Sequence, residues 1–243
     1  MTRSVIRVGG EGARHFLQGL VTNDVAKLDK GLVYAAMLTP QGKYLADFFM
    51  VPDGQDVLID VDASLAEGLF QRLSMYKLRS PVSLTREDTN VTCGTDPAPE
   101  GAFADPRDVS MGWRGYGAGF DASPADWEAL RVAACIPETG IELGPDTFIL
   151  EAGFDRLNGV DFRKGCYVGQ EVTARMRHKT ELRKGLALVA IDGAANPGAE
   201  ITTSEGKAAG TLHTRSGDKA IAYLRFDRAT GEMKAGEATL RRL

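Results

Sequence analysis

The chain has 243 residues, a formal net charge of −4 and 43% hydrophobic residues, values typical of a globular protein that can bury a sizeable core. The negative charge argues against a nucleic-acid-binding protein of the usual basic type. No apolar run approaches the roughly 18 residues that a membrane-spanning helix needs. The start of the chain shows no apolar segment typical of a secretory signal. We therefore expect cytoplasmic residence, with neither a membrane nor a nucleic acid as partner.

The first third of the chain predicts alternating strands and helices. Runs with strand-like composition lie at Val5–Val8, Leu32–Thr39, Tyr44–Val51, Val57–Val61 and Val82–Thr85. One helix is indicated over Glu11–Leu20 by apolar residues at helical spacing, and another begins at Ser64, where Glu67 completes a capping-box pattern. Helices and hairpins mixed in this way favour an α+β layer structure over a doubly wound sheet.

The middle of the chain, Arg86–Asp155, is acidic and rich in glycine and proline. A strand is predicted within Met111–Phe120. A helix is predicted to begin at Ser123-Pro124, with serine as the cap and proline at the first helical position. A second short helix is predicted after Gly169.

The last quarter of the chain has a different pattern. Short apolar runs alternate there with turn residues, at Leu186–Ile191, Ala199–Thr202, Gly210–Thr214, Ala220–Phe226 and Ala238–Leu240. Several short strands with regular turns predict a small antiparallel barrel or sandwich. We place the domain boundary near Leu182, with one domain over residues 1–182 and a β-barrel domain over residues 183–243.

The three cysteines, Cys93, Cys135 and Cys166, are too widely spaced for a C-x-x-C pair, and an odd number argues against a disulfide framework. The three histidines are scattered along the chain, so no local metal motif exists and we expect no metal site within the chain. One cysteine per chain contributing to a metal or cluster held between molecules stays open.

The stretch Lys164–Glu171, K-G-C-Y-V-G-Q-E, is the most informative part of the sequence. It lies in a basic segment, because residues 161–184 hold seven Lys or Arg and three acids, a charge of about +4 within a chain of −4. A positive field favours the thiolate, the form of cysteine that attacks electrophiles or binds metal. Cys166 is therefore the candidate reactive residue. The alternative is a buried, inert thiol, since free cysteine is among the most buried residue types.

The pattern K-G-C-Y-x-G-Q-E, followed by Arg175, resembles the signature of the YgfZ-type folate-binding proteins. These are relatives of the glycine-cleavage T-protein (aminomethyltransferase) and include mitochondrial iron–sulfur assembly factors of the same fold. The resemblance implies an α+β, T-protein-like folate-binding domain followed by a small antiparallel β-barrel. It also implies tetrahydrofolate or another reduced folate as cofactor, and iron–sulfur client or assembly proteins as partners.

Two turns in the first domain carry further resemblances. Asn23 lies in Q-G-L-V-T-N-D, similar to a Q-G-x-x-T-N-D element that the family places beside its central cavity; a capped turn is the competing interpretation. Asp47 ends G-K-Y-L-A-D, where aminomethyltransferases carry G-G-x-x-D-D. Ala46 replaces one of the two acids, which puts glycine-cleavage chemistry in doubt. A lone acid such as Asp47 on a half-exposed strand is usually solvated surface.

The remaining folate contacts are also implied by the resemblance. Arg131 would meet the glutamate tail of a folate, with a salt bridge to nearby acids as the alternative. Glu151 lies where related proteins carry an acidic or amide group near the pterin. Tyr167 would stack on a flat heterocycle or simply pack. Lys164 and Arg175 would shape the potential at the motif, a solvated basic helix being the alternative for Arg175.

By resemblance, the chain is a tetrahydrofolate-binding accessory factor for the assembly or repair of iron–sulfur clusters, with Cys166 as its essential thiol. Two alternatives stay open. A folate-dependent aminomethyl or C1 transferase would need an acid in the channel, for which Asp47 is the candidate. A non-catalytic binding module would use the motif only to hold the two domains together, and Cys166 would then be buried and unreactive.

Overall fold

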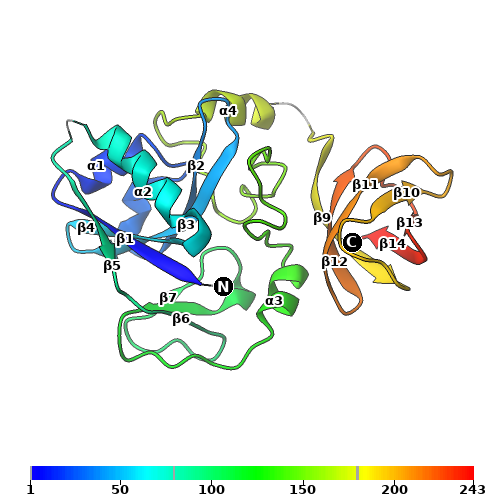
Figure 1. Cartoon of the computed structure of the whole chain (residues 1–243), viewed down its shortest axis with the longest axis horizontal. Coiled ribbons are helices and arrows are strands. Elements are labelled where there is room, and N and C mark those ends of the chain that lie inside the picture. The colour runs from blue at the N-terminus through cyan, green and yellow to red at the C-terminus, as the bar shows by residue number, and fades with distance from the viewer. Residues whose placement is uncertain (1, 79, 179–180) are drawn as a thin grey trace. The chain divides into compact units, whose positions relative to one another are not determined.

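The computed structural model describes residues 2–78, 80–178 and 181–243. It divides into two compact units, Met1–Ala125 with Phe154–Ala174, and Asp126–Gly153 with Arg175–Leu243. Each unit is therefore built from two separate stretches of sequence. The predicted fold class, α+β with a C-terminal antiparallel barrel, is confirmed (Figure 1). Lys179, one of the residues in the basic segment, lies outside the described residues.

A five-stranded antiparallel sheet with the strand order β2-β3-β4-β1-β5 forms the centre of the first unit. Its strands are β1 (Arg3–Gly9), β2 (Val33–Leu38), β3 (Tyr44–Asp53), β4 (Asp56–Asp62) and β5 (Ser83–Glu87). All five strands expected in this region are confirmed. A smaller sheet with the order β6-β8-β7 follows, made of β6 (Val91–Gly94), β7 (Phe103–Ala104) and β8 (Trp113–Tyr116).

One face of the large sheet packs against helices. Because side chains alternate along a strand, Ile6 of β1 and Phe48 of β3 point to the same side, where they join one buried cluster with Leu17 and Leu73. Those two leucines belong to α1 (Ala13–Gln18) and α2 (Ala63–Lys77), so both helices cover this face. A 3₁₀ helix, η1 (Val25–Lys30), follows α1.

Two predicted helix starts are wrong by one to three residues. Helix α2 is capped by Asp62, which accepts a hydrogen bond from the backbone N–H of Ser64, so Ser64 is not the cap. Helix α3 (Trp127–Ala133) is capped by Asp126 and begins after the predicted Ser123. In both cases an aspartate near the predicted serine takes its place, since the two residue types are about equally good caps.

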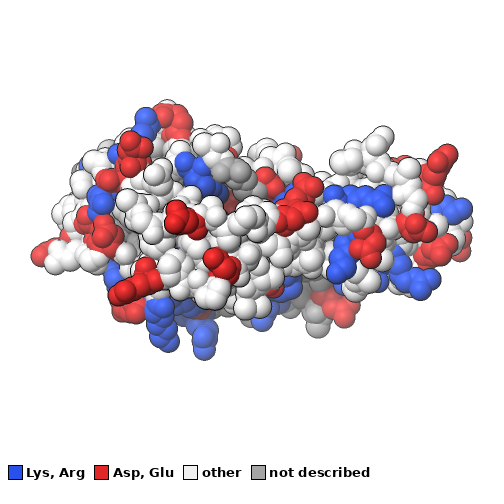
Figure 2. Space-filling model, turned by 90° about the horizontal axis from the view of Figure 1, so that it is seen from below, with Lys and Arg blue, Asp and Glu red and all other residues white. Residues whose placement is uncertain are grey.

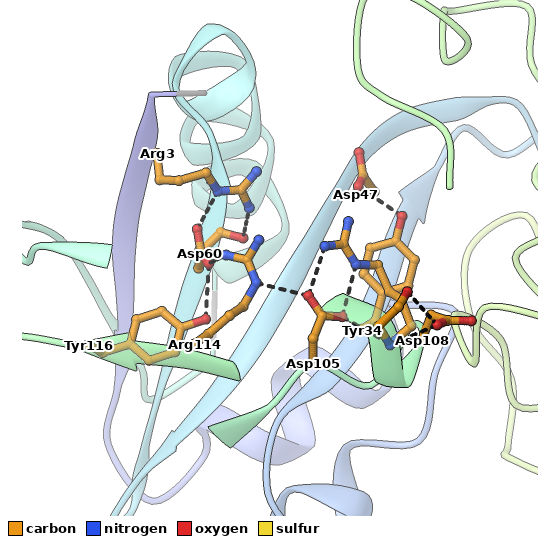
Figure 3. Close-up of polar contacts among 10 residues, drawn as sticks. Arg3, Tyr34, Asp47, Asp60, Asp105, Asp108, Arg114 and Tyr116 are labelled. Carbon is orange, nitrogen blue, oxygen red and sulfur yellow. Dashed lines mark hydrogen bonds and ion pairs between the residues drawn. The ribbon is translucent and has the colours of Figure 1, made fainter. Parts of the chain in front are cut away.

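The opposite face of the large sheet carries a buried network of charged and aromatic side chains. Asp60 of β4 is fully buried and accepts hydrogen bonds from Arg3 Nε (2.6 Å), Arg114 Nη1 (2.9 Å) and the Tyr116 hydroxyl (2.9 Å). Figure 3 shows these three donors converging on the carboxylate. Arg114 and Tyr116 belong to β8, so Asp60 joins the small sheet to the large one.

The same network continues from Arg114 to a second buried carboxylate. Arg114 Nε lies 3.3 Å from Asp105 Oδ2 (Figure 3). Arg107 donates to both oxygens of Asp105, at 3.0 and 2.8 Å. The guanidinium of Arg114 also lies over the ring of Phe49, 4.0 Å from its centroid. Burial works to raise the pKa of Asp105, but Arg107 and Arg114 outweigh it and hold that pKa below its ordinary value.

The second unit contains a closed barrel with the strand order β10-β11-β12-β9-β14-β13. Its strands are β9 (Lys184–Asp192), β10 (Glu200–Thr203), β11 (Ala208–Ser216), β12 (Lys219–Arg225), β13 (Met233–Ala235) and β14 (Ala238–Arg242). In β9, Ala187, Val189 and Ile191 point into the barrel core. Closure removes the free strand edges that an open sheet would expose. The short strand β13 has no counterpart among the predicted strands.

Helix α4 (Gln170–His178) runs across the division between the units and confirms the helix predicted after Gly169. No helix within the described residues is long and apolar enough to span a membrane. On the face shown in Figure 2, basic and acidic side chains are interspersed.

Replacing Asp105 by asparagine tests the buried network. We expect Asp105→Asn to lower the free energy of unfolding at pH 7 by roughly 3 kcal/mol, because Arg107 loses its carboxylate partner and Arg114 keeps only Asp60. Since the folded pKa of Asp105 is depressed, its stabilisation is fully present above the unfolded value of about 3.9 and is lost as the pH falls through the folded value.

Urea unfolding at a series of pH values measures both effects. The wild-type protein should lose stability more steeply below about pH 4 than Asp105→Asn does. Asp88→Asn, at an exposed carboxylate in the same unit, is the control and should follow the wild type. Equal acid sensitivity of wild type and Asp105→Asn would contradict the prediction.

Candidate functional site

The motif Lys164–Glu171 forms an irregular loop, and its last two residues, Gln170 and Glu171, begin α4. Cys166 is exposed on this loop, whereas Lys164 and Tyr167 beside it are buried. A thiol reagent or a partner molecule can therefore reach the sulfur from solvent. The alternative in which Cys166 is an inert core residue does not agree with this exposure.

The loop is fixed on one side by the turn that ends α1. Lys164 Nζ donates to the backbone carbonyls of Gln18 (2.7 Å) and Val21 (2.5 Å). The backbone N–H of Val168 donates to the carbonyl of Gly19 at 3.2 Å. These bonds join the motif to the Q-G-L-V-T-N-D element, so the two sequence patterns singled out separately form one structure.

The ammonium group of Lys164 lies in an unusual environment for a charge. Burial lowers its pKa to about 8, and the nearby carboxylates of Asp24 and Asp161 only partly oppose this effect. The group also lies 4.9 Å from the centroid of the Tyr167 ring. Tyr167 thus packs inside the loop, and burial raises the pKa of its hydroxyl.

The loop is fixed on its other side by the β2–β3 hairpin. Gly169 has a φ of +84°, and a Cβ added there would lie 2.6 Å from the carbonyl oxygen of Thr39. Gly42 in the hairpin turn has a φ of +75°, and a Cβ added there would lie 2.7 Å from Cβ of Val172 in α4. Glycine at both positions lets the two backbones approach closely.

All hydrogen-bonding positions of the Asn23 side-chain amide are occupied by groups of the protein. Its nitrogen donates to the carbonyls of Tyr34 (2.7 Å) and Asn158 (2.6 Å). Its oxygen accepts from the Asp24 backbone N–H and from Lys27 Nζ. With two donors and two acceptor positions used, Asn23 holds the turn together, as the competing interpretation of a capped turn has it.

Asp47 accepts hydrogen bonds from two phenols. The hydroxyl of Tyr44 lies 2.6 Å from one carboxylate oxygen. The hydroxyl of Tyr34 lies 2.9 Å from the other, as Figure 3 shows. Burial, followed by the charge of Asp47, raises the pKa of Tyr34 well above its ordinary value, so this phenol stays a hydrogen-bond donor. Asp47 is therefore held in a fixed orientation on β3.

Arg131 lies in a buried network of the second unit. Its guanidinium contacts Glu138 Oε2 (2.8 Å), Glu142 Oε2 (3.1 Å) and Thr214 Oγ1 (2.7 Å). Only 4% of Arg131 is exposed. The structure thus shows the salt bridge to nearby acids, and it joins α3 to barrel strand β11.

Glu151 contacts the barrel of the same unit. Its Oε2 accepts from the Tyr223 hydroxyl at 2.6 Å and lies 3.8 Å from Lys184 Nζ. Burial and then Glu151 raise the pKa of Tyr223. Among the described contacts, Oε1 of Glu151 receives no hydrogen bond.

The other basic candidate lies on α4. Arg175 is an exposed residue in the last turn of α4, together with Arg177 and His178. Basic side chains in this position stabilise the negative end of the helix dipole. Across the part of the chain that the structure describes, no three His, Cys, Asp or Glu side chains gather in a way that could hold a metal ion.

The Asp60–Arg114–Asp105 network was not among the predicted features. A signal was present, because Asp60 interrupts the apolar strand Val57–Val61, and a carboxylate in such a strand must find a partner when buried. Its partners come from a distant segment at Asp105–Tyr116, which no local pattern connects with β4.

The chain is 32% identical to the iron–sulfur cluster assembly factor IBA57, mitochondrial, of Mus musculus, over 98% of this chain and 80% of that protein. The chain belongs to the IBA57 family. It is 28% identical to the Homo sapiens protein of the same name, over 95% of this chain and 78% of that one.

Other similarities cover parts of the chain or its fold. A Mycosarcoma maydis IBA57 homolog is 35% identical over 75% of this chain, which spans only 54% of that relative's length. Residues 183–242 match the family described as CAF17, C-terminal beta-barrel domain. The crystal structure of glycine cleavage system aminomethyltransferase T from Bartonella henselae superposes with a TM-score of 0.79 at 14% identity, covering 99% of this chain and 82% of that one. The T-protein-like fold is thus confirmed.

The comparisons correct one prediction and leave another open. The relatives are named as mitochondrial proteins, which contradicts the expected cytoplasmic residence. That expectation relied on a missing apolar leader, which bears on secretion alone, since mitochondrial transit peptides are amphipathic and rich in arginine. The relatives carry the IBA57 name, so the YgfZ-type assignment stays a prediction.

Substituting the two motif glycines tests how tightly the loop is held. We expect Gly169→Ala to lower the free energy of unfolding by about 2 kcal/mol, because alanine is strained at positive φ and its Cβ would collide with the Thr39 carbonyl. Gly165→Ala is the matched control, since a Cβ there meets nothing within 4 Å. Urea unfolding should show a change below about 0.5 kcal/mol for the control. Equal effects of the two substitutions would contradict the tight packing at Gly169.

Proposed function

We propose that this chain serves the assembly or repair of iron–sulfur clusters and that Cys166 is the thiol through which it does so. The observation that carries the proposal is an exposed cysteine on a loop held by buried contacts at both sides, in a member of a family of assembly factors. Thiolates are the usual protein ligands of iron–sulfur clusters. A thiol that acts on a cluster in transit must be reachable, and the exposure of Cys166 meets that requirement.

A cluster is here the substrate and is shared with another molecule. Such clusters usually have four cysteine ligands, and this chain has three cysteines that are far apart in sequence. Within the described residues no group of three potential ligands gathers. The remaining thiolates would therefore come from a client or assembly protein, which the family name supports.

The proposal includes a reduced folate, tetrahydrofolate or a relative, as cofactor. Its pterin ring presents N–H groups that need an acceptor, and Glu151 offers a carboxylate oxygen without a described hydrogen bond. This acceptor fits the pterin end of the ligand. We do not propose Arg131 and Asn23 as folate contacts, because both side chains already form hydrogen bonds or ion pairs within the protein.

A folate-dependent C1 transferase receives less support. Such an enzyme needs an acid free to exchange protons, and Ala46 removes one of the two acids found in aminomethyltransferases. Both oxygens of the remaining Asp47 accept from phenols. We therefore assign Asp47 no acid–base role.

Replacing the motif thiol tests the first part of the proposal. We expect Cys166→Ser to reduce cluster-dependent activation of a client enzyme by about tenfold or more, since even removing an outer partner of a metal ligand costs this much. Its free energy of unfolding should stay within about 0.5 kcal/mol of wild type, because the residue is exposed. Client activity in cells that lack the endogenous factor is the measurement.

Cys93→Ser is the matched control and should support normal client activity. Full activity of the Cys166→Ser variant would remove the proposed role of the thiol. Equal loss in both variants would show that the assay responds to stability and not to the motif.

Calorimetry with tetrahydrofolate tests the second part. We expect binding in the micromolar range and an affinity about tenfold lower for Glu151→Gln, because one charge-assisted hydrogen bond to the pterin is lost. Glu128→Gln, at an exposed carboxylate of α3 in the same unit, should bind as wild type. Absence of heat at millimolar folate would contradict the folate proposal and leave the role of Cys166 untouched.

A further inference from the structure

Lys164 is a buried cation that bonds to backbone and not to a carboxylate. It is 7% exposed, and its Nζ donates to the carbonyls of Gln18 and Val21. Among the described residues it forms no ion pair; Asp24 and Asp161 act on it only through their longer-range charge. Asp161 itself pairs with Lys27 at 2.8 Å.

Burying an ammonium group without a counter-ion is energetically unfavourable. Removing a charge from water carries a large free-energy penalty in proteins unless paired charges offset it. An apolar side chain of the same length would fill this position at lower cost. An apolar side chain could not hydrogen-bond to the two carbonyls, whereas the long cationic side chain of Lys164 donates to both at once.

Those carbonyls lie where a helix ends. Gln18 is the last residue of α1, and Val21 follows within the same turn. The last carbonyls of a helix lack intrahelical partners and carry the negative end of its dipole, and a lysine side chain can satisfy both needs. Lys164 thus caps α1 from a segment more than 140 residues away in sequence.

The cap fixes the loop at a point two residues before the thiol. Two residues after it, the N–H of Val168 bonds to the carbonyl of Gly19 in the same turn. Between these two bonds Tyr167 is buried and Cys166 is exposed. The loop is therefore tied on both sides of the cysteine to one rigid element, with the sulfur facing solvent.

We propose that Lys164 is a positioning residue for Cys166: by capping the end of α1 it holds the motif loop so that the thiol is presented at a fixed place on the surface. What the thiol does there rests on the proposed function, whereas its positioning does not. The competing explanation is that Lys164 acts by charge alone, as the neighbouring exposed Arg163 would.

Spin labelling separates position from charge. A nitroxide is attached to Cys166 in full-length protein carrying Cys93→Ser and Cys135→Ser, and its room-temperature spectrum is compared between Lys164→Met and Arg163→Met. Both variants remove one positive charge close to the cysteine, but Lys164→Met alone removes the bonds to Gln18 and Val21. We expect a clearly more mobile nitroxide in Lys164→Met and an unchanged spectrum in Arg163→Met.

Hydrogen exchange provides a readout without a label. The Val168 N–H should exchange about tenfold faster in Lys164→Met than in wild type, because a bond supported by a charged group is lost next to it. The amides of α2 and of the barrel should keep their rates. A purely structural role would instead change the exchange of the whole first unit together.

Three results would overturn the proposal: an immobile nitroxide with unchanged Val168 exchange in Lys164→Met, equal effects of Arg163→Met, or uniformly faster exchange throughout the unit. If Lys164→Met does not fold, Lys164→Gln replaces it, because its shorter amide cannot reach both carbonyls. Faster exchange of the Val168 N–H in Lys164→Gln then supports the proposal, and unchanged exchange overturns it. Activation of a client enzyme by the Cys166→Ser variant tests the proposed function separately. Full activity of that variant would rule out the proposed role of the thiol, and it would leave the positioning role of Lys164 unaffected.

Discussion

The carbonyl groups at the end of α1 need hydrogen-bond partners, and the loop before α4 supplies them. Lys164 and Val168 bond to Gln18, Val21 and Gly19, and this contact joins the two ends of the first unit's sequence. The β2–β3 hairpin meets the same loop through paired glycines, so the loop cannot move without disturbing a helix end or a strand turn. An exposed cysteine in such a place combines accessibility with a defined position, a combination that a mobile loop or a core residue cannot provide.

The two faces of the large sheet are stabilised by different interactions. Its helix-facing side buries aliphatic and aromatic side chains, which stabilise by removal of apolar surface from water. Its other side buries Asp60 with Arg3, Arg114 and Tyr116, an arrangement whose value depends on complete pairing. Each hydrogen bond of that network requires a defined distance and direction. The network therefore fixes how the small sheet packs on the large one.

Several polar residues that resemble ligand contacts are engaged inside the protein. The amide of Asn23 and the guanidinium of Arg131 each make a full set of internal bonds, while Glu151 keeps one carboxylate oxygen without a described donor. The fold is shared with an aminomethyltransferase, and in this chain both carboxylate oxygens of Asp47 accept hydrogen bonds from the phenols of Tyr34 and Tyr44. A shared fold does not by itself carry an enzyme's chemistry, which depends on the residues of its site.

The sequence by itself determined the strands of the main sheet, most of the barrel and the motif around Cys166, because strand alternation, turn residues and a dense short motif are local signals. It could not determine whether a serine or a nearby aspartate caps α2 and α3, since the two residue types cap about equally well. Only the tertiary structure decided that Lys164 caps α1, that Arg114 pairs with Asp60, and that Arg131 faces Glu142 and Thr214. All of these contacts except Arg131–Glu142 join residues far apart along the chain, and their partners are set by how the sheets, helices and loops pack.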